Sequence, residues 1–129
     1  MCYTEEKGGG HLTRQELIAL CLEYPDAYED YPFGGEEAGG VVWTAMRHVS
    51  NKKTFAFIFE RGGLCVNLKC EPARADMLRQ LFDGVTAGYH MNKTHWNTVR
   101  AASDVPPDVL QDMLDESYRL TAPKQGRKI

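Results

Sequence analysis

The sequence predicts a two-layer α+β fold in which helices cover one face of an antiparallel sheet. Runs with apolar residues at period two alternate with segments of helical periodicity, in the order α-βββ-α-ββ-α. Short stretches rich in glycine, asparagine and lysine separate neighbouring strands, which favours antiparallel hairpins. A chain of 129 residues is long enough for one core. We therefore expect a flexible leader over residues 1–12, a single domain over 13–122 and a basic tail over 123–129.

The first helix is predicted to begin after Thr13, because Thr13 and Glu16 have the spacing of a capping box. Pro25 is predicted to stop it, since proline breaks the helical hydrogen-bond pattern. Helical spacing places three residues on its buried face: Leu17, Cys21 and Tyr24.

Residues 24–40 are predicted to form an irregular acidic loop, because they combine acidic side chains with two prolines and four glycines. Aromatic side chains are unusual in a disordered linker and tend to be buried. We therefore expect three of them to hold this loop against the domain: Tyr28, Tyr31 and Phe33.

An antiparallel meander of three strands is predicted next, over residues 41–48, 54–60 and 64–69. Period two in the second strand places three rings on one face: Phe55, Phe57 and Phe59. Period two in the third strand does the same for Leu64, Val66 and Leu68. The turn between the first two strands carries two adjacent lysines, Lys52 and Lys53.

Two further helices are predicted, over residues 71–84 and from about 106 to 122. The apolar stripe of the first consists of Leu78, Leu81 and Phe82. The inward positions of the second are Val109, Leu110, Met113, Leu114 and Ser117. Between these helices we expect two short strands, over 85–90 and 96–100, joined by a turn at 91–94.

The motif GYHMNKTHWNTV, residues 88–99, contains many hydrogen-bond donors and no acidic side chain. Such donors suit phosphate oxygens, and its aromatic rings suit stacking on bases. Two interpretations stay open: a phosphate-binding surface, or a structural hairpin with aromatic core residues. For the first, we predict nucleic-acid contacts at the two basic turns and beside the second one: Lys52, Lys53, His90, Asn92, Lys93, His95, Trp96 and Asn97.

Strand alternation divides this motif between structure and surface. Trp96 and Thr98 are expected on one face of their strand, and Asn97 and Val99 on the other. The indole is expected to be structural and to meet the helices or the aromatic residues of the acidic loop. Four polar residues are expected to face solvent: His90, Asn92, Lys93 and His95.

No catalytic residue, metal site or cofactor is predicted. The histidines of the motif have no neighbouring carboxylate to complete or orient a set of metal ligands. The sequence contains no GxSxG, P-loop or GxGxxG motif. Four cysteines, without the spacing of a zinc site or a redox pair, are expected to be reduced thiols: Cys2, Cys21, Cys65 and Cys70. We therefore expect a binding protein and not an enzyme.

Charge is sorted along the chain. Residues 1–40 hold two basic and nine acidic side chains, whereas residues 41–129 hold thirteen basic and nine acidic ones. A pI near 5.8 argues against nonspecific binding of nucleic acid by the whole surface, but a basic face can still attract phosphates locally. No segment has the features of a membrane span or a signal peptide, so we expect a cytoplasmic protein without membrane contact.

The sequence resembles the MmcQ/YjbR family of small bacterial proteins from about Thr13 to Leu120. The resemblance rests on four segments: DYPFG (30–34), WTAMRHVSNKKTFAFIFERGG (43–63), NLKCEP (67–72) and GVTAGYHMNKTHWNTV (84–99). It implies a two-layer domain of the CyaY-like or secretion-chaperone-like kind, and DNA binding through a double-wing arrangement of hairpin turns. Ala87 stands where many relatives carry proline.

Two functions follow as expectations. The first is a DNA-binding protein that contacts phosphates through its basic turns. The alternative is a protein-interaction module, like the secretion chaperones, which would use the aromatic surface of residues 24–33 to hold a partner segment. The sequence indicates neither a DNA sequence preference nor an oligomeric state.

Overall fold

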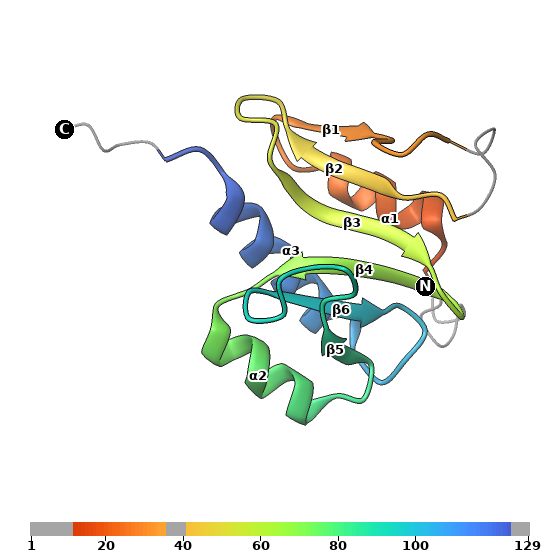
Figure 1. Cartoon of the computed structure of the whole chain (residues 1–129), viewed down its shortest axis with the longest axis vertical. Coiled ribbons are helices and arrows are strands. Elements are labelled where there is room, and N and C mark those ends of the chain that lie inside the picture. Colours follow the sequence, from red (N-terminus) through yellow and green to blue (C-terminus); the bar gives the residue numbers. More distant parts are fainter. Residues whose placement is uncertain (1–11, 36–40, 125–129) are drawn as a thin grey trace.

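The computed structural model describes residues 12–35 and 41–124 (Figure 1). The elements follow in this order: α1 (Arg14–Leu22), β1 (Ala27–Asp30), β2 (Thr44–His48), β3 (Thr54–Glu60), β4 (Leu64–Lys69), α2 (Pro72–Leu81), β5 (Val85–Ala87), β6 (Trp96–Arg100) and α3 (Pro107–Thr121). The predicted alternation of helix, strands, helix, strands and helix is confirmed, with one strand more than expected. Residues 1–11 of the predicted leader and 125–129 of the predicted tail lie outside the described residues.

The strands of the described residues form one antiparallel sheet in the order β1-β2-β3-β4-β6-β5. α1 packs on β1 and β2, α3 on β3 and β4, and α2 on β5 and β6 (Figure 1). Residues of all three helices share one core cluster with the strands, for example Leu17, Leu78 and Leu114. The helices therefore cover one face of the sheet, and the predicted two-layer α+β fold is confirmed.

The start of α1 agrees with the sequence. The Glu16 amide donates to Thr13 Oγ1 over 3.1 Å, and the Thr13 amide donates to Glu16 Oε1 over 3.0 Å. These two bonds form the predicted capping box, which satisfies amides that have no partner inside the helix. Leu17 and Cys21 behind the cap have no exposed surface.

The prediction of an irregular loop over residues 24–40 is wrong for its first part, because residues 27–30 form β1. This strand pairs with β2 in a register that places Ala27 opposite His48 and Asp30 opposite Ala45. Its sequence, AYED, has no apolar alternation, but an edge strand tolerates charged side chains. An ion pair of 2.9 Å between Arg47 Nε and Asp30 Oδ2 links β1 to β2.

The aromatic residues after β1 do not hold this segment down as expected. Phe33 contacts Trp43 edge-on, with ring centroids 6.4 Å apart, but remains 68% exposed. Tyr31 is also an exposed residue, whereas Tyr28 is half-buried. The expected burial is therefore wrong for Phe33 and Tyr31, which follow the end of β1 and remain on the surface.

The prediction that the three phenylalanines of β3 share one face is also wrong. Met46 pairs with Ala56 and Arg47 pairs with Thr54, so Phe55 is an extra residue with no partner on β2. Such a bulge interrupts the alternation of side chains. Phe55 turns towards the helices and contacts Tyr118 of α3, with ring centroids 5.1 Å apart.

α3 presents the predicted inward face: Leu110, Met113, Leu114 and Ser117 are buried and Val109 is half-buried. Ser117 Oγ also donates to the Phe55 carbonyl over 2.6 Å and accepts the Lys69 amide over 2.8 Å. The hydroxyl therefore ties α3 to both β3 and β4, beside the bulge.

α2 agrees with the sequence except at its end. Pro72 occupies the first turn and Leu78 is buried, as predicted. Leu81 is 62% exposed, so its assignment to the apolar stripe is wrong. α2 packs mainly on β6 and the three-residue β5 at one margin of the sheet, and the end of the helix that carries Leu81 is left exposed.

Candidate binding face of the sheet

The helix-free face of the sheet carries a cluster of aromatic rings. Trp43 stacks on Phe59 with centroids 4.3 Å apart, and Tyr89 stacks on Phe59 with centroids 5.6 Å apart. The planes of Trp43 and Tyr89 differ by only 6°, so the two rings form one aromatic layer over Phe59. Phe59 is consequently buried, whereas Trp43 and Tyr89 are half-buried and present ring surface to solvent.

The loop of residues 88–95 is bonded onto this face, which explains how Tyr89 reaches it. The Tyr89 amide donates to Thr98 Oγ1 over 2.8 Å, and Asn67 Nδ2 donates to the Tyr89 carbonyl over 3.0 Å. Gly88 permits the close approach, because a Cβ atom there would lie 2.8 Å from Trp96 Cβ. The main chain of Tyr89 is therefore held by hydrogen bonds to side chains of β4 and β6.

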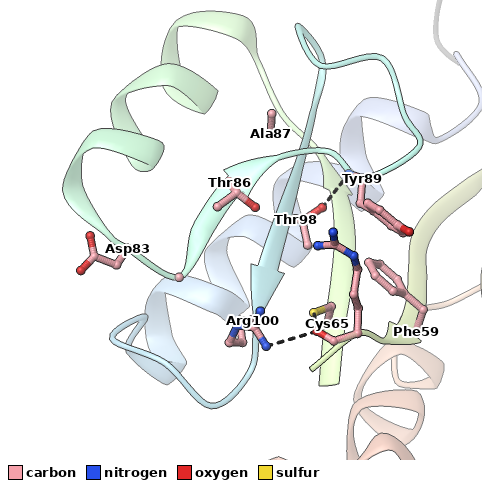
Figure 2. Close-up of a pocket in the computed structure, with 10 residues that line it drawn as sticks. Phe59, Cys65, Asp83, Thr86, Ala87, Tyr89, Thr98 and Arg100 are labelled. Carbon is pink, nitrogen blue, oxygen red and sulfur yellow. Dashed lines mark hydrogen bonds between the residues drawn. The ribbon is translucent and has the colours of Figure 1, made fainter. Parts of the chain in front are cut away.

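Two hollows border the aromatic layer. The first is apolar, has a volume of about 350 Å³, and is lined by Phe33, Trp43, Phe57, His90 and Met91. The second has a volume of about 150 Å³ and a more polar lining, shown in Figure 2. Its lining includes the side chains of Arg61, Thr86, Tyr89, Thr98 and Arg100. Tyr89 and His90 are neighbours in the chain, so the two hollows lie on either side of this dipeptide.

The two basic turns that the sequence singled out lie at the same end of the sheet. β3 begins at Thr54 and β6 begins at Trp96, and β4 lies between them. Ala56 pairs with Leu68, which pairs with Asn97, so these two beginnings are in register. Two strand spacings separate them, which is about 10 Å.

Most of the predicted contact residues are on the surface. The exposed ones are Lys52, Lys53, His90, Asn92, Lys93 and His95. Trp96 is half-buried, and its indole contacts Phe57 on the helix-free face, with ring centroids 6.3 Å apart. The prediction that the indole meets the helices or the aromatic residues of the acidic loop is therefore wrong. The predicted alternation of β6 is confirmed, because Val99 and Asn97 face the helices and Trp96 and Thr98 do not.

The prediction that Asn97 contacts nucleic acid is wrong. Its side chain has no exposed surface, so it does not reach a ligand on the surface. Asn97 Nδ2 donates to the Ala75 carbonyl over 3.2 Å, and Asn97 Oδ1 accepts from Arg79 Nε over 2.6 Å. Asn97 is therefore a structural residue between β6 and α2.

Lys93 is exposed, as predicted, but its ammonium group is engaged. Nζ donates to the Gly88 carbonyl over 2.7 Å, and the Lys93 carbonyl accepts from Arg79. The side chain of Asn92 is also bonded within the loop, because its Oδ1 accepts hydrogen bonds from the amides of Thr94 and His95. These bonds give the loop a defined conformation, in which His90 adopts a positive φ of 62°.

The sequence reasoning missed two residues that line the hollows, Trp43 and Arg61. Trp43 carried a usable signal, since it precedes Ala45 and Arg47 at period two. Arg61 carried none, because it is distant in the sequence from Arg100 and meets it only through the pairing of β4 with β6.

No group of three His, Cys, Asp or Glu side chains with metal-binding proximity occurs within residues 12–35 and 41–124. Cys21, Cys65 and Cys70 are free and buried, and Cys2 lies outside the described residues. Burial raises the pKa of Cys65, the thiol that lines the polar hollow. A buried thiol with a raised pKa is a poor nucleophile.

A comparison with known protein families identifies the family of this chain. The YjbR family model matches residues 22–120, which include the whole sheet but leave out nearly all of α1. The chain belongs to the YjbR family. The family match confirms the resemblance and adds no binding partner or activity.

The match with each of two relatives covers almost the whole length of that relative. The protein YyaQ of Bacillus subtilis is 31% identical over 121 residues, covering 85% of this chain and 98% of the relative. The protein YjbR of Escherichia coli K12 is 29% identical over 122 residues, covering 92% of this chain and 97% of the relative. Both are named as uncharacterized proteins, so they extend the family assignment and leave its function to be argued from structure.

Solved structures share the same fold. The crystal structure of Deinococcus radiodurans protein DR2400 is 30% identical and has a TM-score of 0.75, covering 92% of this chain and 85% of that one. A crystal structure of a Pseudomonas syringae protein has a TM-score of 0.73 at 24% identity, covering 86% of this chain and 100% of that one. The second likeness concerns the fold alone.

Within the described ranges, no helix is long and apolar enough to cross a membrane.

Proposed function

We propose that the protein is a cytoplasmic nucleic-acid-binding protein that acts without catalysis. The supporting observation is the helix-free face, where Trp43, Phe57 and Tyr89 are half-buried and lie beside turns that carry cations. Rings with accessible surface stack on bases, and neighbouring lysines and arginines attract the backbone, a combination suited to single strands. We therefore expect DNA or RNA single strands to bind more tightly than duplex DNA.

Lys52 and Lys53 are the cations proposed to hold phosphates. Both are exposed, and neither forms an ion pair within the described part of the chain. His90 and His95 are exposed beside the second turn and add hydrogen-bond donors. Lys93 is retained as a weaker contributor, because its ammonium group already donates to Gly88.

The test is a titration of a labelled single strand and its duplex at about 50 and 200 mM salt, over which phosphate contacts lose affinity steeply. The charge-removal variant is Lys52→Asn with Lys53→Gln; asparagine suits position 52, where φ is 61°. Losing two phosphate contacts should lower the slope of log K against log salt by about 1.4 for a single strand.

A control for loss of charge elsewhere on the surface is Arg119→Gln, which removes one positive charge from the exposed surface of α3, in the helical layer. It should leave the slope unchanged. Failure of the wild-type protein to bind either nucleic acid at the lower salt concentration would rule out the proposal.

A second candidate function, a protein-interaction module, is favoured by one observation. Phe33 is 68% exposed at the rim of the apolar hollow that Trp43 and Phe57 also line. A hollow of this size and chemistry suits the apolar side chain of a partner segment. One variant distinguishes the two functions. Phe33→Ala should abolish binding of peptides selected on the wild-type protein, and it should leave the affinity for a single strand at low salt unchanged.

A further inference from the structure

The polar hollow contains an arginine whose guanidinium group is available for a ligand. Arg61 lies over the ring of Tyr89, with its Cζ atom 4.2 Å from the ring centroid. In the described part of the chain its guanidinium forms neither a hydrogen bond nor an ion pair. Tyr89 therefore fixes the plane of the group by a cation–π contact and leaves its donors at the rim of the hollow.

Arg100 supplies a second guanidinium to the lining of the same hollow (Figure 2). Its Nη1 donates to the Gly62 carbonyl over 2.7 Å and to the Arg61 carbonyl over 3.3 Å. These bonds hold Arg100 against the β3–β4 turn and leave its other donors free. Gly63 permits the approach, since a Cβ atom there would lie 3.1 Å from Nη1. The hydroxyl of Thr86 on β5 completes the donors of the lining.

The nearest acidic groups do not neutralise the two arginines. Asp83 belongs to the lining, but its carboxylate points away from Arg100 (Figure 2). Asp104 accepts the amides of Asp83 and Gly84, each over 2.8 Å, and is occupied there. Glu60 lies 3.7 Å from Arg14, so its charge is shared with that arginine although it also acts on Cys65 of the lining. The hollow therefore keeps an excess of positive charge.

We propose that this hollow binds a phosphate group, with Arg61 and Arg100 as its charged donors and the Thr86 hydroxyl as a third donor. Two guanidinium groups match the charge and the several oxygens of a phosphate monoester better than those of a carboxylate. A volume of about 150 Å³ is sufficient, since a cavity of that size holds a benzene molecule.

The phosphate has two possible sources, the free anion and the terminal phosphate of a nucleic-acid strand. The second source rests on the proposed function. It is favoured by the position of the hollow, because Tyr89 both lines the hollow and belongs to the aromatic layer on which an attached base would stack. The site then recognises the end of a strand, whereas Lys52 and Lys53 contact its interior phosphates.

The experiment follows amide chemical shifts of the full chain by NMR during titration with inorganic phosphate. We expect saturable shifts at the β3–β4 turn, Thr86 and Arg100. Arg61→Gln should weaken phosphate binding roughly ten- to a hundredfold, the effect of losing a charged hydrogen-bond partner. The control Arg119→Gln, with the same loss of charge on α3, should leave binding unchanged. Arg61 is exposed, so its variant should fold as the wild type does.

A second arm compares single strands that carry a 5′-phosphate, a 3′-phosphate or only hydroxyl ends. Preference for one phosphorylated end by about tenfold, lost in Arg61→Gln, supports the strand-end source. Saturable phosphate binding without such a preference supports the free anion and overturns the strand-end source alone. Shifts that do not saturate, or that are the same in Arg61→Gln, overturn the site. The salt dependence of the hydroxyl-ended strand tests nucleic-acid binding separately.

Discussion

The guanidinium of Arg79 donates from Nε to the side-chain oxygen of Asn97 over 2.6 Å, and this bond joins α2 to β6. The same arginine donates to the carbonyls of Lys93 and Trp96, so one side chain of α2 holds both the loop and the start of β6. Asn97 has no exposed surface. The pair therefore explains why this asparagine of the motif is structural, whereas Asn92 in the same motif is exposed.

Asn97→Ala should lower the free energy of unfolding by about 2 kcal/mol. The substitution leaves Arg79 Nε and the Ala75 carbonyl without their partner, and a buried group without its hydrogen bond costs about 1–3 kcal/mol. Urea unfolding followed by far-UV circular dichroism measures the change. Gln80→Ala, on the exposed side of α2, is the control and should stay within about 0.5 kcal/mol. An Asn97→Ala variant as stable as this control would contradict the structural role.

Lys93→Ala should cost about 1 kcal/mol, although the residue is exposed. Its ammonium group donates to the Gly88 carbonyl over 2.7 Å, and a net hydrogen bond contributes about 0.5–1.5 kcal/mol. Lys53→Ala removes an exposed lysine from the other turn and should change stability by no more than about 0.5 kcal/mol. Equal denaturation midpoints for the two variants would mean that the Lys93 bond adds nothing to the loop.

Local sequence signals were sufficient for the helices. The capping box of Thr13 and Glu16, the proline at the start of α2 and the inward positions of α3 all describe interactions within a few residues of one another. The alternation of β6 was also readable, because Val99 is apolar and its neighbours are not. These features depend on neighbouring residues, which a single sequence displays.

The remaining features depend on pairing between distant segments. Residues 27–30 become a strand because β2 offers them a partner, not because of their own pattern. Phe55 leaves the face of Phe57 because the register of β2 with β3 shifts opposite it. Asn97 is buried because Arg79 of α2 lies over it. No local periodicity reports these contacts, so the candidate site was only partly predictable.

The three described cysteines should resist alkylation in the native protein at pH 8. Burial raises the pKa of Cys21 to about 12, and burial together with the neighbouring Glu116 raises that of Cys70 to about 11. Burial also raises the pKa of Cys65. Iodoacetamide labelling followed by peptide mass spectrometry should find these thiols unmodified, and fully modified after unfolding in guanidinium chloride. Rapid native labelling of Cys65 would show that the floor of the polar hollow opens to solvent.

Stability should decrease as the pH falls below about 6.5, because of His48. This side chain is 1% exposed and lies against Phe55 and Tyr118. Burial lowers its pKa below the ordinary value of 6.5, and the opposing charge of Asp26 offsets only part of that effect. Below pH 6.5 the unfolded chain therefore binds a proton that folded His48 does not, so acid favours unfolding until the lowered pKa is reached.

The variant His48→Gln isolates this contribution to the pH dependence. Glutamine has no titration in this range and keeps a donor for the contact with Thr121 Oγ1, which His48 Nε2 makes over 2.8 Å. Urea unfolding at pH 7.5 and 5.5 should show a smaller loss of stability in the variant than in the wild type. The other histidines are present in both proteins, so the comparison isolates the effect of His48. The carboxylates of Asp26 and Asp104, whose pKa values are lowered from 3.8, act only at more acidic pH. An unchanged pH dependence in the variant would mean that His48 accepts its proton while folded, with the C-terminal end of α3 moving away to admit water.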